Sequence, residues 1–378
     1  MKEKQLYQFP IIHQFLTRNK LKAAAAFTMA GALFLMPFSG MNILAASTGT
    51  GEIVITAVGD CTLGNDEKQE GRSTCFHNVY NANGPEYFLQ NVRGVFQADD
   101  LTIVNLECVL TTLGEREKNK DWCFRSDPAY MEILTSSSVE AVSFANNHCR
   151  DYGEISYTDT INTLNTYNMP YTSELSTKVM TVNNIKVGLI AIQAAYRSSD
   201  EDKDKEYYDT EELLRLTDTC IADVKSKGAE LIIMNYHWGF EGTAKVSAQQ
   251  KTLGHHAVDN GCALVIGHHP HVLQPVELYN GAYIIYSLGN FCFGGNTNPK
   301  DKDTIIWQQS FKLTGGKITS TSARIYPCRI SSTTSVNDYC PTILDGAAAQ
   351  KVINRMNTMS SPYGVEFMDT GYLAEKTE

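Results

Sequence analysis

Three common catalytic and binding motifs are missing from this 378-residue sequence. No two cysteines have the C-x-x-C spacing, which argues against a zinc site built on thiolates. No G-x-x-x-x-G-K-[ST] motif is present, which excludes nucleotide binding by a P-loop. Ser287 in YSLGN lacks the glycine two residues before it that a nucleophile elbow requires, so a serine hydrolase is poorly supported.

Charged side chains are absent from residues 23–51, and most of residues 23–38 is apolar. The preceding 22 residues carry five Lys and Arg against one acid, and residues 44–47 are LAAS. A basic region, an apolar core and a small-residue exit are typical of a bacterial secretion signal, and the uncharged span is also long enough to cross a bilayer. No cysteine lies near residue 46, which excludes a lipid-modified N-terminus. We expect residues 1–46 to be a signal peptide or an N-terminal membrane anchor of an extracytoplasmic protein, either secreted or anchored in the cell membrane.

Basic residues are scarce in the remainder of the chain. Beyond residue 46 there are 27 Lys and Arg against 41 Asp and Glu, a formal charge of −14. Because an acidic surface repels phosphate backbones, we expect no nucleic-acid partner. No internal repeat or low-complexity linker divides these residues. We expect the main domain over residues 47–330 and a C-terminal extension with a helix over residues 331–378.

Ten cysteines in an exported chain are candidates for disulfide bonds. They form no tight framework, and several lie inside apolar strands. Cys328 and Cys340, which flank a Ser/Thr-rich segment, are the pair we most readily expect to be joined, with Cys75 and Cys123 second. Cys61, Cys108 and Cys149, which directly follow polar candidate residues, are predicted to be small packing residues.

Predicted strands and helices alternate along the chain, which indicates an α/β fold. Two hairpins, 179–182 with 185–192 through Asn183-Asn184 and 307–313 with 317–326 through Gly315-Gly316, make the sheet partly antiparallel. The charged segment 197–209 is expected to be an exposed loop. The other expected strands are 53–58, 101–107, 141–145, 231–237, 263–266 and a last core strand within 282–294, and the expected helices are 85–100, 128–136, 154–168, 211–227 and 248–260.

Polar side chains stand at the ends of five of these strands. The stretch ALVIGHHPH (263–271) places three of the nine histidines directly after a short buried strand. In an open α/β sheet a ligand site forms at the carboxyl ends of the strands, and imidazole is the commonest protein metal ligand. The sequence therefore predicts a metal site that draws on Asp60, Glu107, Asn147, His148, His237, His268, His269 and His271.

Oxygen and nitrogen donors together suit Mn²⁺, Fe²⁺ or Zn²⁺ rather than Cu(I). Six or more candidate donors are too many for one ion with an open position. They suit two divalent metal ions a few ångström apart, which can clamp a phosphoryl-like oxyanion and supply a nucleophile.

The ordered run GD, NLE, FANNHCRDYG, HWGFE, GHHPHVLQPVE and YSLGNF resembles the CapA family, the bacterial poly-γ-glutamate capsule biosynthesis proteins, over residues 52–294. The resemblance implies the calcineurin-like metallophosphoesterase fold, an α/β/β/α sandwich of two mixed sheets flanked by helices. It also implies an extracytoplasmic role in the synthesis or transport of an anionic polymer.

The resemblance also implies roles for single residues. Asp60 matches the first aspartate of the superfamily's metal motifs, but Thr62 stands where that motif has a histidine. Glu107 resembles the bridging carboxylate. Asn147 resembles the amide ligand and His148 the adjacent histidine that protonates the leaving group. His237 resembles the lone histidine ligand, and the H-x-H spacing favours His269 and His271 over His268 as the final pair.

Arg125, in CFRSDP, matches a position where this family also carries Phe-Arg. A guanidinium near the metals would hold a carboxylate or phosphate in a bidentate manner, whereas a surface ion pair is the alternative. The leading function is a metal-dependent hydrolase, most simply a phosphoesterase, that acts on an anionic cell-envelope polymer or its precursor. The alternative is a non-catalytic binding or scaffold subunit of a membrane-bound polymer synthase or export complex, since a fold does not settle function.

Overall fold

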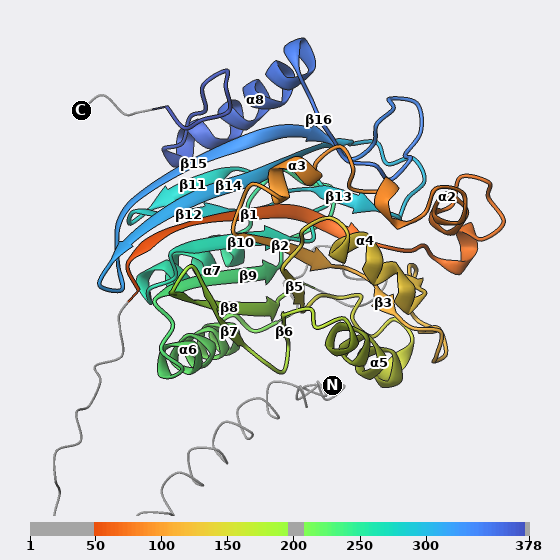
Figure 1. Ribbon diagram of the computed structural model, residues 1–378, viewed down its shortest axis with the longest axis horizontal. Helices are drawn as coiled ribbons and strands as arrows, with labels where there is room; N and C mark the ends of the chain where they lie inside the picture. Colours follow the sequence, from red (N-terminus) through yellow and green to blue (C-terminus); the bar gives the residue numbers. More distant parts are fainter. Residues whose placement is uncertain (1–48, 196–207, 375–378) are drawn as a thin grey trace, which may run out of the picture.

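The computed structural model describes residues 49–195 and 208–374, which form two mixed β-sheets packed face to face (Figure 1). The first sheet has the strand order β16-β15-β14-β1-β2-β5-β6, with β13 paired to the end of β1. Its strands are β1 (Gly51–Thr62), β2 (Leu101–Leu106), β5 (Ala141–Phe144), β6 (Tyr171–Ser173), β13 (Asn290–Phe293), β14 (Asp303–Thr314), β15 (Lys317–Arg329) and β16 (Thr342–Ile343).

The second sheet has the order β11-β12-β10-β9-β8-β7. Its strands β8, β9, β10 and β12 are parallel to one another, and they read as nearly continuous apolar runs because both of their faces are covered. The strands are β7 (Lys178–Val182), β8 (Ile185–Gln193), β9 (Leu231–His237), β10 (Leu264–His268), β11 (Val276–Tyr279) and β12 (Ala282–Ile285), and the separate short pair is β3 (Val109–Leu110) with β4 (Arg125–Ser126).

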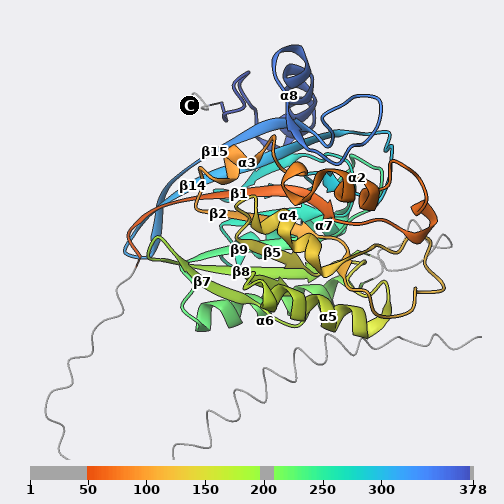
Figure 2. The same cartoon turned by 45° about the vertical axis from the view of Figure 1, so that its right-hand side comes forward.

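Helices cover the outer face of each sheet. The first sheet is covered by α2 (Phe76–Asn83), α3 (Arg93–Phe96), α4 (Met131–Thr135) and α5 (Gly153–Thr166), and the second by α6 (Thr210–Ser226) and α7 (Ala248–Asp259). A third apolar core lies between the two sheets, and α8 (Gly346–Ser360) packs against it beside β15 and β11 (Figures 1 and 2). The predicted four-layer α/β/β/α sandwich is therefore confirmed.

Both predicted hairpins are confirmed. Asn183 and Asn184 have φ of 48° and 64°, and Gly315 and Gly316 have φ of 58° and 72°, which are the left-handed values that a tight two-residue hairpin turn requires. The segment 85–100 differs from its prediction, because it forms only a 3₁₀ turn (Pro85–Tyr87) and the four-residue helix α3. The expected exposed loop 197–209 and the predicted signal or anchor segment 1–46 lie largely or wholly outside the described residues.

The last predicted core strand is two strands in two different sheets. β12 pairs in the second sheet, whereas β13 pairs with β1 in the first. The chain passes from one sheet to the other through Tyr286–Gly289, where Gly289 has a φ of +73° that favours glycine. The passage places Asn290 beside Asp60.

The disulfide predictions are wrong. All ten cysteines lie within the described residues, all are buried, and none is joined to another. Cys328 packs in the core beneath the outer helices of the first sheet, whereas the Cys340 sulfur lies 3.3 Å from the carbonyl oxygen of Tyr87. Cys123 donates toward the carbonyl of Glu117. The thiols fill small apolar gaps, as expected for Cys61, Cys108 and Cys149.

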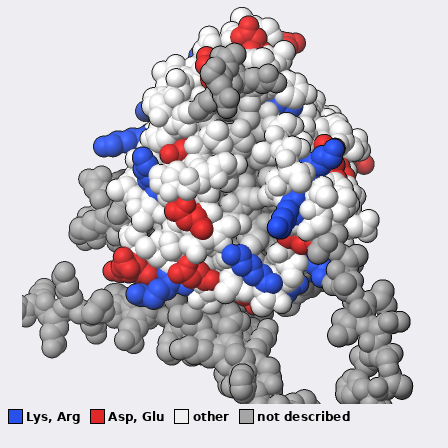
Figure 3. Space-filling view, turned by 90° about the vertical axis from the view of Figure 1, so that its left-hand side faces the viewer, with Lys and Arg blue, Asp and Glu red and all other residues white. Residues whose placement is uncertain are grey.

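The described helices include none that is both long enough and apolar enough to span a membrane. At the end of the sandwich where β1 begins, acidic and basic side chains are interspersed, and neither sign forms a continuous patch on that face (Figure 3).

Glu140, the residue before β5, is a partly buried carboxylate whose Oε2 accepts a 2.8 Å hydrogen bond from the backbone N–H of Thr102. Burial, together with the charge of Asp99, raises the pKa of Glu140 from 4.5 to about 7. The folded state therefore holds this proton more tightly than the unfolded state, and stability falls as the pH rises between these two values.

We expect Glu140→Gln to raise the free energy of unfolding by about 1 kcal/mol at pH 8 and to change it little at pH 4.5. The gain is small because the carboxylate is partly exposed, and the glutamine oxygen can keep the bond from Thr102. Urea unfolding at the two pH values measures the effect, with Glu132→Gln on α4 as the control. An equal gain at both pH values would show that the cause is not this titration.

Candidate metal centre

The two sheets bring their polar strand ends to one place. β1, β2 and β5 are parallel in the first sheet, β9 and β10 are parallel in the second, and the carboxyl ends of both sets lie on the same side of the sandwich (Figure 1). Asp60 lies two residues before the end of β1, Glu107 directly follows β2, and Asn147 lies three residues after β5. His237 ends β9, and the turn with His269 and His271 follows β10. The convergence is the one that the strand-end pattern predicts.

Two glycines permit this close approach. The backbone N–H of Asp60 donates to the carbonyl of Gly289 at 2.9 Å, and a Cβ atom on Gly59 would lie 2.1 Å from the same oxygen. A Cβ atom on Gly267 would lie 2.1 Å from the carbonyl oxygen of Tyr286. A larger residue at either position would displace the strand end that carries a candidate ligand.

One set of candidate ligands consists of Asp60, Glu107 and His271, whose ligand atoms all lie within 4.8 Å of one another. His271 Nδ1 is 3.3 Å from Asp60 Oδ2, and its Nε2 is 3.8 Å from Glu107 Oε1. Both carboxylates are fully buried.

A second set shares Glu107 and adds His237 and His269. His237 Nε2 lies 3.4 Å from Glu107 Oε1 and 2.7 Å from the amide oxygen of Asn147. Glu107 therefore belongs to both of these sets.

A third set consists of Glu241, His269 and His271. Glu241 lies in the loop after β9, and it is exposed, unlike the carboxylates of the other two sets. Partial desolvation beside the histidine turn acts to raise the pKa of Glu241, but the neighbouring His271 and His269 lower it below its ordinary value.

His268 and Thr62 belong to none of these sets among the described residues. His268 is the last residue of β10, and its Nδ1 lies 3.2 Å from Asp60 Oδ1. The Thr62 hydroxyl donates to the backbone carbonyl of Glu107 at 3.3 Å. The sets contain His269 and His271, the pair that the H-x-H spacing favours.

The turn that carries this pair is strained. His269 has a φ of 96° and His271 a φ of 57°, values that side chains other than glycine rarely adopt. Pro270 between them fixes its own φ. Strained backbone of this kind persists where the surrounding structure holds a functional group in place.

We expect His269→Gly to be more stable than His269→Ala by about 1 kcal/mol. Both variants lose the imidazole, but only glycine adopts the positive φ without strain. Chemical unfolding of both variants in a chelator measures the difference. Equal stability, or a more stable alanine variant, would show that the backbone at this position is not strained.

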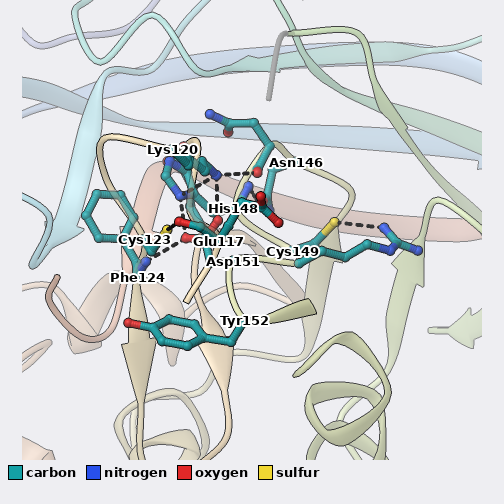
Figure 4. Close-up of polar contacts among 12 residues, drawn as sticks. Glu117, Lys120, Cys123, Phe124, Asn146, His148, Cys149, Asp151 and Tyr152 are labelled. Atoms are coloured by element: carbon teal, nitrogen blue, oxygen red, sulfur yellow. Dashed lines mark hydrogen bonds and ion pairs between the residues drawn. The ribbon is translucent and has the colours of Figure 1, made fainter. Parts of the chain in front are cut away.

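His148 is held beside the ligand sets by three neighbours, Asp151, Lys120 and Phe124 (Figure 4). Its Nδ1 lies 2.6 Å from Asp151 Oδ2 and 3.1 Å from Lys120 Nζ, and its ring packs 4.3 Å from the Phe124 ring, centre to centre. Lys120 Nζ also forms an ion pair of 2.5 Å with Asp151. This arrangement directs the other ring nitrogen, Nε2, to a position 4.0 Å from Glu107 Oε1.

Two buried amides hold the strand ends in place. The Asn146 side-chain oxygen accepts from the backbone N–H of His148 at 3.0 Å, and its amide group donates to the carbonyl of Leu106 at 2.8 Å. Asn105 donates to Asp60 Oδ1 at 2.8 Å. These bonds fix the turn after β5 against the end of β2 and β2 against β1.

The site concentrates opposed charges in a buried space. Burial and the charge of Asp60 raise the pKa of Glu107 well above its ordinary value. Burial acts in the same direction on Asp60, but His268 and His271 lower the pKa of Asp60 well below its usual range. Burial lowers the pKa of His269 to about 4, whereas the carboxylates of Glu107 and Asp60 overcome burial and raise the pKa of His271 to about 10.

These residues fit divalent metal ions. Both carboxylate oxygens of Glu107 and Nδ1 of His269 are buried, and none of these three atoms has a hydrogen-bond partner among the described residues. Buried polar groups are nearly always compensated, and a cation would compensate these. Carboxylate oxygen, amide oxygen and imidazole nitrogen form the mixed donor set of Mn²⁺, Fe²⁺ and Zn²⁺.

Arg125 is not brought to this cluster. Its guanidinium forms a 3.0 Å ion pair with Glu67 and stacks 4.0 Å from the centre of the Tyr152 ring. Side chains alternate along extended chain, so Phe124 faces His148 while Arg125 faces a cavity of about 340 Å³ on the other side of β4. The catalytic role of Arg125 stays a prediction.

Three residues of the site were not singled out from the sequence: Lys120, Asp151 and Glu241. Asp151 follows His148 by three residues within the quoted motif FANNHCRDYG, so its spacing could have indicated a carboxylate beside the imidazole. Glu241 lies in HWGFE, four residues after His237. Lys120 lies in an irregular segment with no periodic pattern, and no signal in the sequence indicates its position.

Comparison with known proteins identifies one family and individual relatives that are named for capsule or PGA synthesis. A family model described as the bacterial capsule synthesis protein PGA_cap matches residues 54–295. The chain is 27% identical over 267 residues to the capsule biosynthesis protein CapA of Bacillus anthracis, which covers 66% of this chain and 62% of that protein. It is 26% identical over 245 residues to the PGA biosynthesis protein CapA of Bacillus subtilis, covering 61% and 63%. The chain thus spans about three fifths of the length of these relatives.

Two solved structures are more distant. The NAD nucleotidase of Haemophilus influenzae has a TM-score of 0.40 at 14% identity, covering 82% of this chain and 57% of that chain. The sulfate thiohydrolase SoxB of Thermus thermophilus has a TM-score of 0.39 at 12% identity, covering 88% and 62%.

Proposed function

The chain belongs to the bacterial capsule synthesis protein family PGA_cap, and from this membership we propose that it acts in the biosynthesis of a poly-γ-glutamate-type capsule. Its chemical role is that of a metal-dependent hydrolase, most simply a phosphoesterase. Its substrate is an anionic cell-envelope polymer or a precursor of that polymer, and it works outside the cytoplasmic membrane beside a membrane-bound synthase complex.

One observation carries the proposed chemistry. Glu107 is fully buried, both of its oxygens lack hydrogen-bond partners among the described residues, and histidines from two strand ends surround it. An isolated buried carboxylate is costly, and a pair of divalent cations is the partner that its histidine and carboxylate neighbours are suited to bind.

The two overlapping sets would hold one ion each. Asp60, Glu107 and His271 would hold the first, and Glu107, His237, His269 and Asn147 the second. When bound, such ions polarise a phosphoryl oxygen and lower the pKa of bound water.

The proton-transfer role falls to His148. Asp151 and Lys120 hold its Nδ1 side, so Nε2 faces the ligand sets from a fixed direction. Nε2 donates a proton to the leaving oxygen of the substrate, as a positioned imidazole does in general acid catalysis. Phe124 packs on the ring and excludes water from one of its faces.

The extracytoplasmic location rests on the uncharged N-terminal segment and its basic flank. The polymer context rests on the family and on the names of the two Bacillus relatives. The anionic character of the polymer also suits a cationic metal centre.

A test of the function is turnover of a chromogenic phosphodiester by the purified protein with and without added Mn²⁺. The account predicts turnover that depends on the metal and is lost in His237→Ala. A protein that binds metal but turns over neither this ester nor cell-envelope material would support the binding or scaffold role instead.

A further inference from the structure

The loop after β9 is tied to the histidine turn after β10. The backbone N–H of Gly242 donates to the carbonyl of Pro270 at 2.9 Å. The Gln274 side chain donates to the carbonyls of Thr243 and Lys245 at 3.0 and 3.2 Å. Bonds on both sides of the turn thus hold the loop 239–245 beside His269 and His271.

Glu241 is the acidic residue of this loop, directly before Gly242. One of its carboxylate oxygens lies within 4.8 Å of a ring nitrogen of His269 and of a ring nitrogen of His271, and those two nitrogens also lie within 4.8 Å of each other. Nδ1 of His269 is buried and has no hydrogen-bond partner among the described residues. A carboxylate oxygen beside two imidazoles, one of them unpartnered, is the arrangement of a metal-binding set.

We propose that Glu241 is a further metal ligand of this site, which joins His269 and His271 at its solvent-facing side. The inference rests on the proposed metal centre and adds to it a ligand beyond the buried sets. Those sets place their carboxylates in the protein interior, whereas Glu241 is exposed. The set of Asp60, Glu107 and His271 has three protein ligands, which leave the coordination of Mn²⁺ or Zn²⁺ incomplete. The exposed carboxylate of Glu241 adds a donor beside His271 without a further buried charge.

The competing explanation is that Glu241 is a surface carboxylate attracted to a cationic site without binding the ion. The two explanations predict different effects on the bound metal ion. A direct ligand alters the electronic spectrum of the bound metal, whereas a remote charge alters only its affinity. A remote charge at the surface is also screened by salt, since the Debye length falls to about 3 Å at 1 M.

The test compares wild type with Glu241→Gln, Glu241→Asp and the control Glu132→Gln, which removes an exposed carboxylate from α4. Calorimetry measures Mn²⁺ affinity, and visible absorption of the Co²⁺-loaded protein reports the ligands. We expect Glu241→Gln to lose about tenfold or more in affinity, because even outer partners of metal ligands contribute 10–100-fold. We expect its Co²⁺ spectrum to change, Glu241→Asp to keep part of the affinity, and the control to match wild type.

Two results would overturn the inference and leave the proposed function standing. The first is a Glu241→Gln variant that binds Mn²⁺ like wild type. The second is an affinity loss with an unchanged Co²⁺ spectrum that disappears in 1 M salt. A wild-type protein that binds neither ion would overturn the inference and the proposed function together. Thermal unfolding in a chelator checks that Glu241→Gln is folded, and the lost attraction between Glu241 and the two histidines should lower its stability only slightly.

Discussion

His148→Ala is expected to lower the turnover of a confirmed phosphoester substrate by about 10²–10⁴-fold while the protein keeps its metal. The imidazole lies next to Asn147 but in none of the ligand sets, so its removal leaves the donors in place. His237→Ala, by contrast, removes a buried donor that lies 3.4 Å from Glu107 and 2.7 Å from the Asn147 oxygen. It should lose metal and turnover together.

The measurement pairs steady-state turnover with metal analysis of each variant after dialysis. His256→Ala on α7 is the matched control, because this histidine belongs to none of the ligand sets among the described residues and pairs with the exposed Asp218. His148→Ala with wild-type turnover would remove the acid role from this residue. His148→Ala without metal would make it a ligand.

Glu107→Gln is expected to reverse the order of stability when metal is added. In a chelator at about pH 7, the raised pKa of Glu107 lowers the stability of wild type, because the unfolded chain releases the proton that the folded protein retains. The amide does not titrate and avoids this loss, so the variant should then unfold at a higher temperature. With metal at 1,000 times its Kd, wild type gains about 4 kcal/mol and the variant, which lacks the shared carboxylate, gains little.

Thermal unfolding in EDTA and in excess Mn²⁺ measures this crossover, with Glu132→Gln as the control that should follow wild type in both. If Glu107→Gln is less stable than wild type in both conditions by the same amount, Glu107 has a structural role and does not bind the ion.

The residues at the strand ends were the part of the site that the sequence predicted most readily. In Asp60, Glu107 and His237, a polar residue ends or directly follows a buried apolar run, and such a residue has a fixed place at the edge of a sheet. The family resemblance supplied the division into two sheets, which the periodicity of the strands alone does not reveal.

Residues on loops could not be placed in this way. Glu241 reaches the site because Gly242 bonds to Pro270, a contact between segments about thirty residues apart that no local pattern encodes. Lys120 reaches His148 from an irregular segment. Arg125 was predicted to lie at the site but does not. Neighbouring side chains point to opposite faces of an extended chain, so Phe124, one residue earlier, is the neighbour of His148.

The pairing of the cysteines and the division of the last core strand could not be predicted either, because both depend on tertiary structure. Cys328 and Cys340 flank one segment, but they are not joined: Cys328 packs in the core and Cys340 contacts Tyr87. The break between β12 and β13 follows from the passage at Gly289 between the sheets. The sequence does not reveal this break, because the apolar residues on both sides of Gly289 have the pattern of a single strand.

The metal content of the purified protein tests the central claim most directly. After exposure to Mn²⁺, Fe²⁺ or Zn²⁺ and removal of free ions, elemental analysis should find about two equivalents in wild type and a clear loss in Glu107→Gln, because Glu107 belongs to both buried sets. A wild-type protein that retains none of the three ions, with its fold intact by circular dichroism, would contradict the account.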